Sequence, residues 1–214
     1  MKYVIYILLT LFLLASCQKE EYVGTPRGMG TLVLETLSVQ TENVNTVFTR
    51  AVEPDLYVEI WQNGQLLTGQ RYEPGKVPGK LDLPAGVYLL KTYNQAYQDM
   101  SGWLDTEKGN MAFSAEKDFE IESNEINYLS VEVPMVNIGV SLKLPEGFSD
   151  RFKDYHFTVQ VGNRSVEISN GETAYFPLSE VTYILSATNN DGENKTKSKT
   201  IKSPVAGTIY EISY

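Results

Sequence analysis

The chain has 214 residues, a formal net charge of -9 at pH 7, one cysteine and one histidine. An acidic chain lacks the basic face that binding to phosphate backbones or anionic lipid requires, so we predict no nucleic-acid partner. Because one cysteine and one histidine leave almost no soft metal ligands, we expect no metal or other cofactor. The content of 42% hydrophobic and 21% charged residues is typical of a globular protein.

Residues 1–16 are predicted to be a lipoprotein signal peptide. Lys2 supplies a positive start, and residues 3–14 form an uncharged, mostly apolar run. This run suits the apolar region of a signal peptide but is shorter than the roughly 20 residues that a membrane-spanning helix needs. Leu14-Ala15-Ser16-Cys17 then resembles a lipobox, in which the chain is cut before the cysteine and the thiol receives a diacylglycerol. An ordinary signal peptide with a chance cysteine is the alternative.

Lipidation of Cys17 would use the only thiol of the chain and make the membrane its first partner. Buried acyl chains such as palmitate contribute about 0.8 kcal/mol per methylene group, so more than one chain gives durable anchoring. Gln18-Lys19-Glu20-Glu21 resembles the acidic signal that sends Bacteroidota lipoproteins to the outer face of the outer membrane. Residues 17–30 are therefore expected to be a lipidated tether at the cell surface, although a tether on the periplasmic face is the alternative.

From residue 31 onward, short apolar or alternating runs are separated by turn residues, which is typical of β-sandwiches and barrels. Asn63-Gly64 lies between two such runs and predicts a hairpin, because a type I′ turn needs positive φ at both central residues. The expected strands span residues 31–39, 55–62, 65–72, 78–83, 86–93, 116–122, 126–133, 136–144, 154–161, 164–168, 173–178, 181–188, 195–202 and 206–213.

A domain boundary is predicted at Val133-Pro134-Met135, because Pro134 interrupts the hydrogen bonding of a strand and a new alternating strand follows it. The expected fold is all-β, with two consecutive antiparallel β-sandwiches of the transthyretin or immunoglobulin type at residues 31–134 and 135–214. A single elongated sandwich is the alternative. One short helix is expected at Phe148–Lys153, with Ser149 as its N-cap and Phe148 and Phe152 four residues apart.

The stretch from Tyr93 to Phe113 departs from the strand-and-turn pattern of the rest of the chain. Unusually long loops in compact domains tend to be functional. Aromatic rings together with amide and carboxylate groups suit a sugar or a protein partner, so Tyr93, Tyr97 and Trp103 are candidate ligand contacts. The alternative is a lid whose aromatic side chains plug the end of the first sandwich.

The sequence contains no recognisable catalytic constellation. His156 lies in a strand-like run on the face opposite Phe157, where a solvent-exposed or core-edge position is the simplest interpretation. There is no Gly-x-Ser-x-Gly elbow to hold a nucleophilic serine and no phosphate-binding glycine loop. A glycosidase pair of carboxylates stays open, because sequence does not give the distance between them. A small sandwich with short loops offers little cleft, so we predict that the protein is not an enzyme.

Several short motifs follow one another along the chain: the lipobox, Gly30-Thr31-Leu32, Thr49-Arg50-Ala51, Tyr57-Val58-Glu59-Ile60, Leu83-Pro84-Ala85-Gly86-Val87-Tyr88 and Asp154-Tyr155-His156-Phe157-Thr158-Val159. Their order resembles the Bacteroidota lipoprotein family of domain of unknown function 4493, which has no assigned chemistry. The broader likeness is to fimbrillin-type proteins, which have two transthyretin-like β-sandwiches. In those proteins a cut after an arginine removes the first strand, and a strand of a neighbouring subunit fills the groove.

This resemblance implies that Arg50 is a candidate processing site and that strand exchange is a candidate route to self-assembly. A solvated loop arginine is the alternative for Arg50. We therefore predict a non-catalytic, surface-exposed outer-membrane lipoprotein that acts as an adhesin-like protein or as a fimbrial accessory or subunit protein. A surface lipoprotein that binds glycans through the Tyr93–Phe113 loop is the alternative function.

Overall fold

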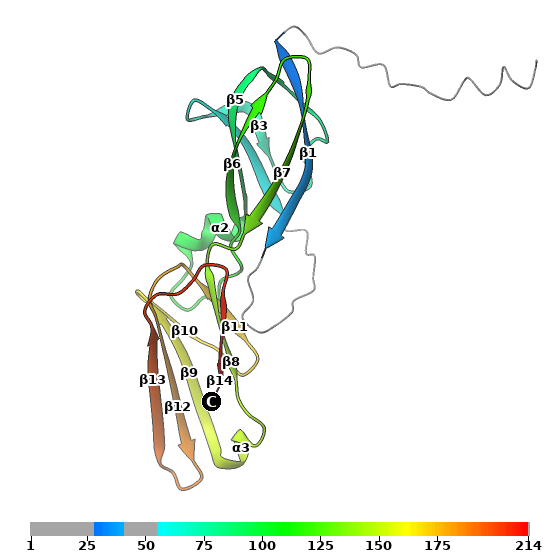
Figure 1. Ribbon diagram of the computed structural model, residues 1–214. Helices are drawn as coiled ribbons and strands as arrows, with labels where there is room; N and C mark the ends of the chain where they lie inside the picture. The colour runs from blue at the N-terminus through cyan, green and yellow to red at the C-terminus, as the bar shows by residue number, and fades with distance from the viewer. Residues whose placement is uncertain (1–27, 41–54, 214) are drawn as a thin grey trace, which may run out of the picture.

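The computed structural model describes residues 28–40 and 55–213 (Figure 1). Cys17 and Arg50 lie outside these residues, so lipidation and processing stay predictions. Within the described ranges no helix has the length and apolar character needed to span a membrane. Fourteen strands are present there, and every expected strand range overlaps one of them.

The first half of the chain supplies seven strands, with a short helical segment between the fifth and sixth. The strands are β1 (Met29–Gln40), β2 (Leu56–Gln62), β3 (Gln65–Tyr72), β4 (Leu81–Pro84), β5 (Gly86–Asn94), β6 (Ser114–Ile121) and β7 (Ile126–Pro134). The helical segment consists of α2 (Gln95–Asp99) and the 3-10 helix η1 (Met100–Gly102).

The second half supplies seven more strands and one short helix. They are β8 (Ile138–Lys143), α3 (Phe148–Arg151), β9 (Phe152–Val161), β10 (Arg164–Glu167), β11 (Thr173–Phe176), β12 (Val181–Asn189), β13 (Asn194–Ile201) and β14 (Ile209–Ser213). In Figure 1 the two groups of strands stand end to end, with α2 near the junction.

The two groups have the same sheet topology. The first contains sheets with the orders β4-β1-β7 and β3-β2-β5-β6, and the second contains β11-β8-β14 and β10-β9-β12-β13. Adding seven to each strand number of the first group gives the second group. The predicted all-β fold of two sandwiches is confirmed. One strand pair in each sandwich departs from the antiparallel expectation, because β1 runs parallel to β7 and β8 runs parallel to β14.

Each sandwich buries its own apolar cluster between its two sheets. In the first, Val58 and Ile60 of β2 are fully buried, and in the second, Phe157 and Val159 of β9 occupy the corresponding inward positions. Burial of such side chains contributes about 1.5–3 kcal/mol each. Met135 packs in the first cluster, although the prediction places it in the second domain, and the ranges 31–134 and 135–214 stay a prediction.

Two local predictions have different outcomes. Asn63 and Gly64 have φ angles of 51° and 76°, so the predicted hairpin turn with two positive φ angles is confirmed. The short helix begins at Phe148, with Gly147 at its N-cap, so the prediction that Ser149 caps it is wrong. Gly147 adopts a φ of 74°, which lets the chain turn into the helix before Ser149 is reached. The rings of Phe148 and Phe152 do stack, with centroids 4.7 Å apart.

Candidate functional site

The outer face of the sheet β3-β2-β5-β6 carries a group of half-buried aromatic and charged side chains. Because side chains alternate along a strand, the inward positions of Val58 and Ile60 direct Tyr57, Glu59 and Trp61 of β2 to the outer face. On the neighbouring strand β5, the register places Tyr93 opposite Tyr57 and Lys91 opposite Glu59. On the other side, Arg71 of β3 lies opposite Glu59.

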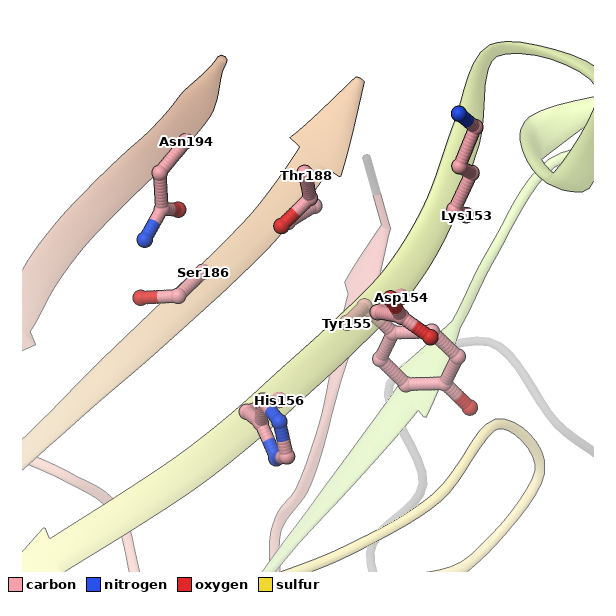
Figure 2. A pocket seen from close by; sticks show the side chains of 8 residues that line it. Lys153, Asp154, Tyr155, His156, Ser186, Thr188 and Asn194 are labelled. Atoms are coloured by element: carbon pink, nitrogen blue, oxygen red, sulfur yellow. The ribbon is translucent and has the colours of Figure 1, made fainter. Parts of the chain in front are cut away.

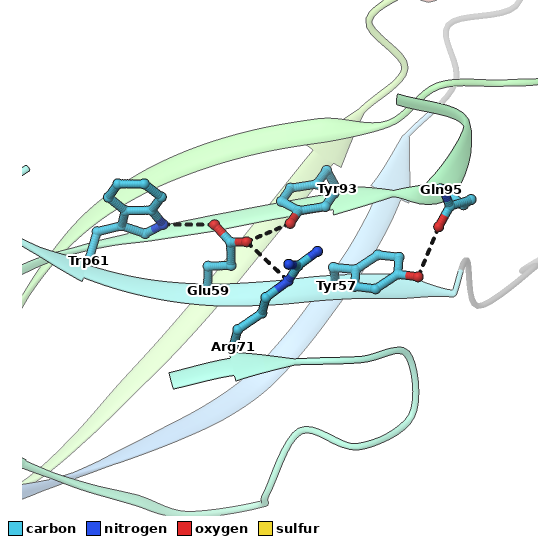
Figure 3. Close-up of polar contacts among 6 residues, drawn as sticks. All are labelled: Tyr57, Glu59, Trp61, Arg71, Tyr93 and Gln95. Atoms are coloured by element: carbon cyan, nitrogen blue, oxygen red, sulfur yellow. Dashed lines mark hydrogen bonds and ion pairs between the residues drawn. The ribbon is translucent and has the colours of Figure 1, made fainter. Parts of the chain in front are cut away.

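Glu59 is the centre of this group, with a relative exposure of 7%. Its Oε1 accepts a hydrogen bond of 2.6 Å from the Tyr93 hydroxyl and lies 3.4 Å from Nε of Arg71 (Figure 3). Its Oε2 accepts a hydrogen bond of 2.8 Å from Nε1 of Trp61. Three donors from three strands thus hold the carboxylate, and the contacts fix the orientation of the rings around it.

Three tyrosines form a row across the face, which we call the tyrosine ladder: Tyr57, Tyr93 and Tyr97. The rings of Tyr57 and Tyr93 stack with centroids 5.5 Å apart and planes inclined by 19°. Those of Tyr93 and Tyr97 are 6.0 Å apart and inclined by 35°. The Arg71 guanidinium lies 5.7 Å from the Tyr57 centroid at one end, and Tyr97, which is 41% exposed, forms the open end.

The helix α2 positions the open end of the ladder. Asn94 caps it, since its Oδ1 accepts hydrogen bonds from the backbone nitrogens of Tyr97, at 3.1 Å, and Phe113, at 3.0 Å. The Tyr57 hydroxyl donates to Oε1 of Gln95 at 2.9 Å, which ties the first residue of the helix to β2 (Figure 3). The sequence prediction missed this helix, and an asparagine at the N-cap position was the available signal.

The environment of Tyr93 keeps its hydroxyl protonated. Burial is the largest cause that raises the pKa of Tyr93, and the hydrogen bond to Glu59 and the negative charge of that carboxylate raise it further. Arg71 and Gln98 act in the opposite direction. The protonated hydroxyl is the form that donates to Glu59, so the contact persists throughout the neutral pH range.

The basic side chains of this face are paired within it. Lys91 places its ammonium 4.7 Å from the Trp61 ring centroid, and Nζ lies 2.7 Å from Oε1 of Glu116 on β6. Two apolar side chains border this part of the face, Leu66 at 38% and Val87 at 63% exposure. The result is an aromatic surface whose two cations already have acidic or aromatic partners.

Trp103 does not join the other two candidate contacts. Its ring lies 5.2 Å from the guanidinium carbon of Arg164 on β10, and the Phe176 ring packs 4.9 Å from the same carbon. Arg164 is 9% exposed and donates to the backbone oxygens of Leu104, at 3.3 Å, Tyr175, at 3.0 Å, and Glu107. We call this contact between the two sandwiches the arginine clasp.

Further backbone hydrogen bonds strengthen the clasp. Ser165 N donates to Asp105 O at 3.0 Å, and Tyr175 N donates to Lys108 O at 2.6 Å. Burial lowers the pKa of Arg164, while the charges of Glu107 and Asp105 oppose that shift. Part of the long Tyr93–Phe113 segment thus connects the sandwiches, and its first part completes the tyrosine ladder.

A second surface feature is a shallow hollow of about 560 Å³ on the outer face of β9, β12 and β13. Figure 2 shows its side chains spread over these strands rather than converging on one point. His156 is exposed, as alternation predicts, and its Nδ1 lies 2.7 Å from Oε1 of Glu167. The hollow is lined by Lys153, Asp154, Tyr155, His156, Ser186, Ala187, Thr188 and Asn194.

Metal-ligating side chains do not gather in the part of the chain that the structure describes. Residues 28–40 and 55–213 contain no group of three or more histidine, cysteine, aspartate or glutamate side chains placed to hold a metal ion.

Comparison with known proteins gives a family and several distant structural relatives. The profile of the family described as "Domain of unknown function (DUF4493)" matches residues 28–214. No curated protein sequence matches the chain.

Three of the solved structures to which the chain is similar come from Bacteroides. A candidate adhesin from Bacteroides ovatus is 12% identical, with a TM-score of 0.41, and the match covers 92% of this chain and 96% of that one. A candidate cell adhesion protein from Bacteroides uniformis is 11% identical, with a TM-score of 0.49 and coverages of 87% and 94%. A protein from Bacteroides thetaiotaomicron, named as a candidate polysaccharide-binding protein, is 7% identical, with a TM-score of 0.44 and coverages of 77% and 78%.

Proposed function

Given that the chain belongs to the DUF4493 family, we propose that it is a non-catalytic, lipid-anchored surface protein that binds a partner in the manner of an adhesin. The partner would be held on the outer face of the first sandwich, at the tyrosine ladder. The observation that carries this proposal is the ordered aromatic group around Glu59 on an open sheet face. Half-buried aromatic groups that are open to a partner at one end, as here at Tyr97, are typical of contact surfaces.

The fold does not require aromatic side chains at these positions. The second sandwich builds the same four-stranded sheet with mainly polar side chains on its outer face, namely His156, Thr158, Thr182 and Ser186 beside the apolar Ile184. Because the same topology forms with mainly polar side chains there, stability of the fold alone does not account for the ladder. A binding role does account for it.

The state of Glu59 favours binding over catalysis. Both of its carboxylate oxygens accept contacts from neighbouring side chains, and the side chain is nearly buried. A general acid or base needs an oxygen that can reach a substrate. Here both carboxylate oxygens of Glu59 are already in contact with Trp61, Tyr93 or Arg71. Glu59 is thus better suited to hold the aromatic rings in place.

The anchor and the location can be tested on the native protein. Mass spectrometry of the outer-membrane fraction should find an N-terminus at Cys17 that carries acyl chains. Treatment of intact cells with a protease should remove the protein if it faces outward, and an unlipidated N-terminus or full protection from the protease would contradict this part of the proposal.

The binding role can be tested with beads that carry the full mature chain. We expect these beads to adhere to bacterial or host cells, and the variant Tyr97→Ala, at the open end of the ladder, to reduce adhesion. Tyr128→Ala removes a tyrosine that is 62% exposed on the other sheet and serves as the matched control. Equal adhesion of beads with and without protein would contradict the adhesin-like role.

The position of β1 favours a second candidate, a fimbrial subunit that assembles by strand exchange. β1 is the central strand of the sheet β4-β1-β7, and Leu32 in it is 1% exposed. If a protease cut after Arg50, loss of β1 would leave a groove between β4 and β7 that a strand of another subunit could fill. An N-terminus at Ala51 in the sheared surface fraction would support this candidate, and an intact Cys17 N-terminus there would count against it.

A further inference from the structure

The charges beside the tyrosine ladder are balanced locally. Arg71 contacts Glu59, and Lys91 contacts Glu116. The β6 residue opposite Tyr93 is Ser114, which is uncharged. The ladder therefore offers no unpaired cation to an acidic ligand.

Farther along the same face, the charges disfavour an anionic polymer. The register places Asp118 opposite Leu89 and Glu120 opposite Val87, so β6 carries a line of carboxylates toward that end of the sheet. A polymer of acidic sugars that crossed the face would meet these carboxylates and be repelled. An uncharged ligand pays no such electrostatic penalty.

The side chains at the open end of the ladder are suited to bind the hydroxyl-rich rings of sugars. Tyr97 presents an exposed ring beside Gln98, whose side chain is also exposed on α2, whereas the amide of Gln95 already accepts from the Tyr57 hydroxyl and donates to Oδ1 of Asp99 at 2.8 Å. An aromatic ring packs against the apolar face of a sugar, and a primary amide both donates to and accepts from hydroxyl groups. The contacts with Glu59 and Gln95 order two of the rings in advance, so little side-chain entropy is lost on binding.

From this geometry we propose that the tyrosine ladder binds an uncharged polysaccharide, with a sugar ring against Tyr97 and its hydroxyl groups near the amide of Gln98. The ligand lies along the open face of the sheet, where a polymer contacts several side chains at once. This inference rests on the proposed binding function and names the class of its ligand.

Electrophoresis of the full mature chain through gels that contain a soluble polysaccharide tests this directly. The probes are a β-glucan, a mannan and a xylan, with polygalacturonate as the acidic counterpart. We expect at least one neutral polymer to slow the wild type, and Tyr97→Ala to weaken the apparent affinity about tenfold, as loss of an aromatic contact with the ligand does. Tyr128→Ala should migrate like the wild type.

Three results would overturn the proposal: no neutral polymer slows the protein, only polygalacturonate slows it, or Tyr97→Ala binds as well as the wild type. Gln98→Ala gives a second readout, because it removes an amide but none of the three ladder rings, and we expect a smaller loss of affinity. Melting temperatures of the variants within a few degrees of the wild type establish that a loss of binding is not a loss of folding.

The bead assay separates a failure of this inference from a failure of the adhesin-like role. Periodate destroys sugars with neighbouring hydroxyl groups, whereas a protease removes surface proteins. Ladder-dependent adhesion that periodate abolishes and protease spares supports the polysaccharide. Ladder-dependent adhesion that only protease abolishes overturns the polysaccharide and leaves the binding function standing with a protein partner.

Discussion

The two sandwiches have the same strand order but present different outer faces on their four-stranded sheets. The first carries the tyrosine ladder around a nearly buried carboxylate. On the second, hydroxyl groups pair across strands, with Thr182 and Thr200 oxygens 2.9 Å apart and Ser186 and Thr196 oxygens 3.1 Å apart. The same strand order therefore forms with two different sets of outward side chains, so the inward residues and the turns are what the two sandwiches share.

Substitution of Arg164 should have the largest effect on stability, because it removes the arginine clasp that joins the two sandwiches. Arg164→Ala leaves backbone oxygens of Leu104, Glu107 and Tyr175 without their buried donor, which should lower the free energy of unfolding by about 3 kcal/mol. Denaturant unfolding measures this loss. We also expect the wild type to unfold in one transition and Arg164→Ala to unfold in two.

Arg151→Ala, at an exposed position in α3, is the matched control and should change stability little. If Arg164→Ala and Arg151→Ala unfold alike, the arginine clasp does not join the sandwiches.

Two glycines at corresponding positions of the sandwiches differ in the space around them. Gly30 of β1 lies opposite Leu83 of β4, and Gly139 of β8 lies opposite Tyr175 of β11. A Cβ at Gly30 would lie 2.2 Å from the backbone oxygen of Glu122, whereas one at Gly139 would meet only side-chain atoms, at 3.1 Å or more.

We therefore expect Gly30→Ala to cost about 3 kcal/mol, because backbone must move, and Gly139→Ala to cost about 1 kcal/mol or less. Thermal unfolding of the two variants measures both. Equal losses at the two positions would mean that the first sandwich accommodates the methyl group by a shift of the loop at Glu122.

Thr92 is a position in the core of the first sandwich where a substitution should increase stability. Its Oγ1 is buried without a hydrogen-bond partner, and no other buried side-chain nitrogen or oxygen in the described parts of either sandwich shares this state. Thr92→Val replaces the hydroxyl by a methyl group of similar size, so we expect a gain of about 1 kcal/mol in the free energy of unfolding. Thr158→Val on the outer face of β9 is the control, and a loss of stability in Thr92→Val would indicate a partner for the hydroxyl.

Alkaline pH should produce the smallest effect. Burial and Glu59 raise the pKa of Tyr93, so the folded state favours the protonated hydroxyl. This contribution is complete below the ordinary tyrosine pKa of 10.0 and is lost as the pH rises from there toward the pKa of the folded state. Tyr93→Phe should flatten the decline of stability above pH 10, measured by urea unfolding, relative to Tyr128→Phe. Parallel declines of stability in both variants would show that ionisation of Tyr93 does not contribute to the pH dependence.

The strands and their turns could be predicted because their signals are local. Alternation and turn residues indicate where each strand begins and ends, and Asn63-Gly64 indicates the connection. Pairing direction is a different matter, since alternation is the same in parallel and antiparallel strands. The parallel pairs of β1 with β7 and β8 with β14 therefore left no local signal.

The candidate site could be predicted only in part, for a physical reason. Tyr93 and Tyr97 were named from the long loop, but Tyr93 reaches Glu59 across 34 positions of sequence, which no local pattern records. The five residues of α2 span little more than one turn of 3.6 residues, too short for a helical period to appear. Trp103 is also in that loop, yet its ring packs on Arg164 of the second sandwich.

The parallel pairing of first and last strands has a mechanical consequence. Because β1 and β7 run in the same direction, the chain enters the first sandwich at one end and leaves it at the other, and β8 and β14 repeat this arrangement (Figure 1). A pull between the start of β1 and the end of β7 loads the hydrogen bonds of this pair in shear, so that they must break together. We expect single-molecule pulling to show high rupture forces, and a gradual opening at low force would contradict this expectation.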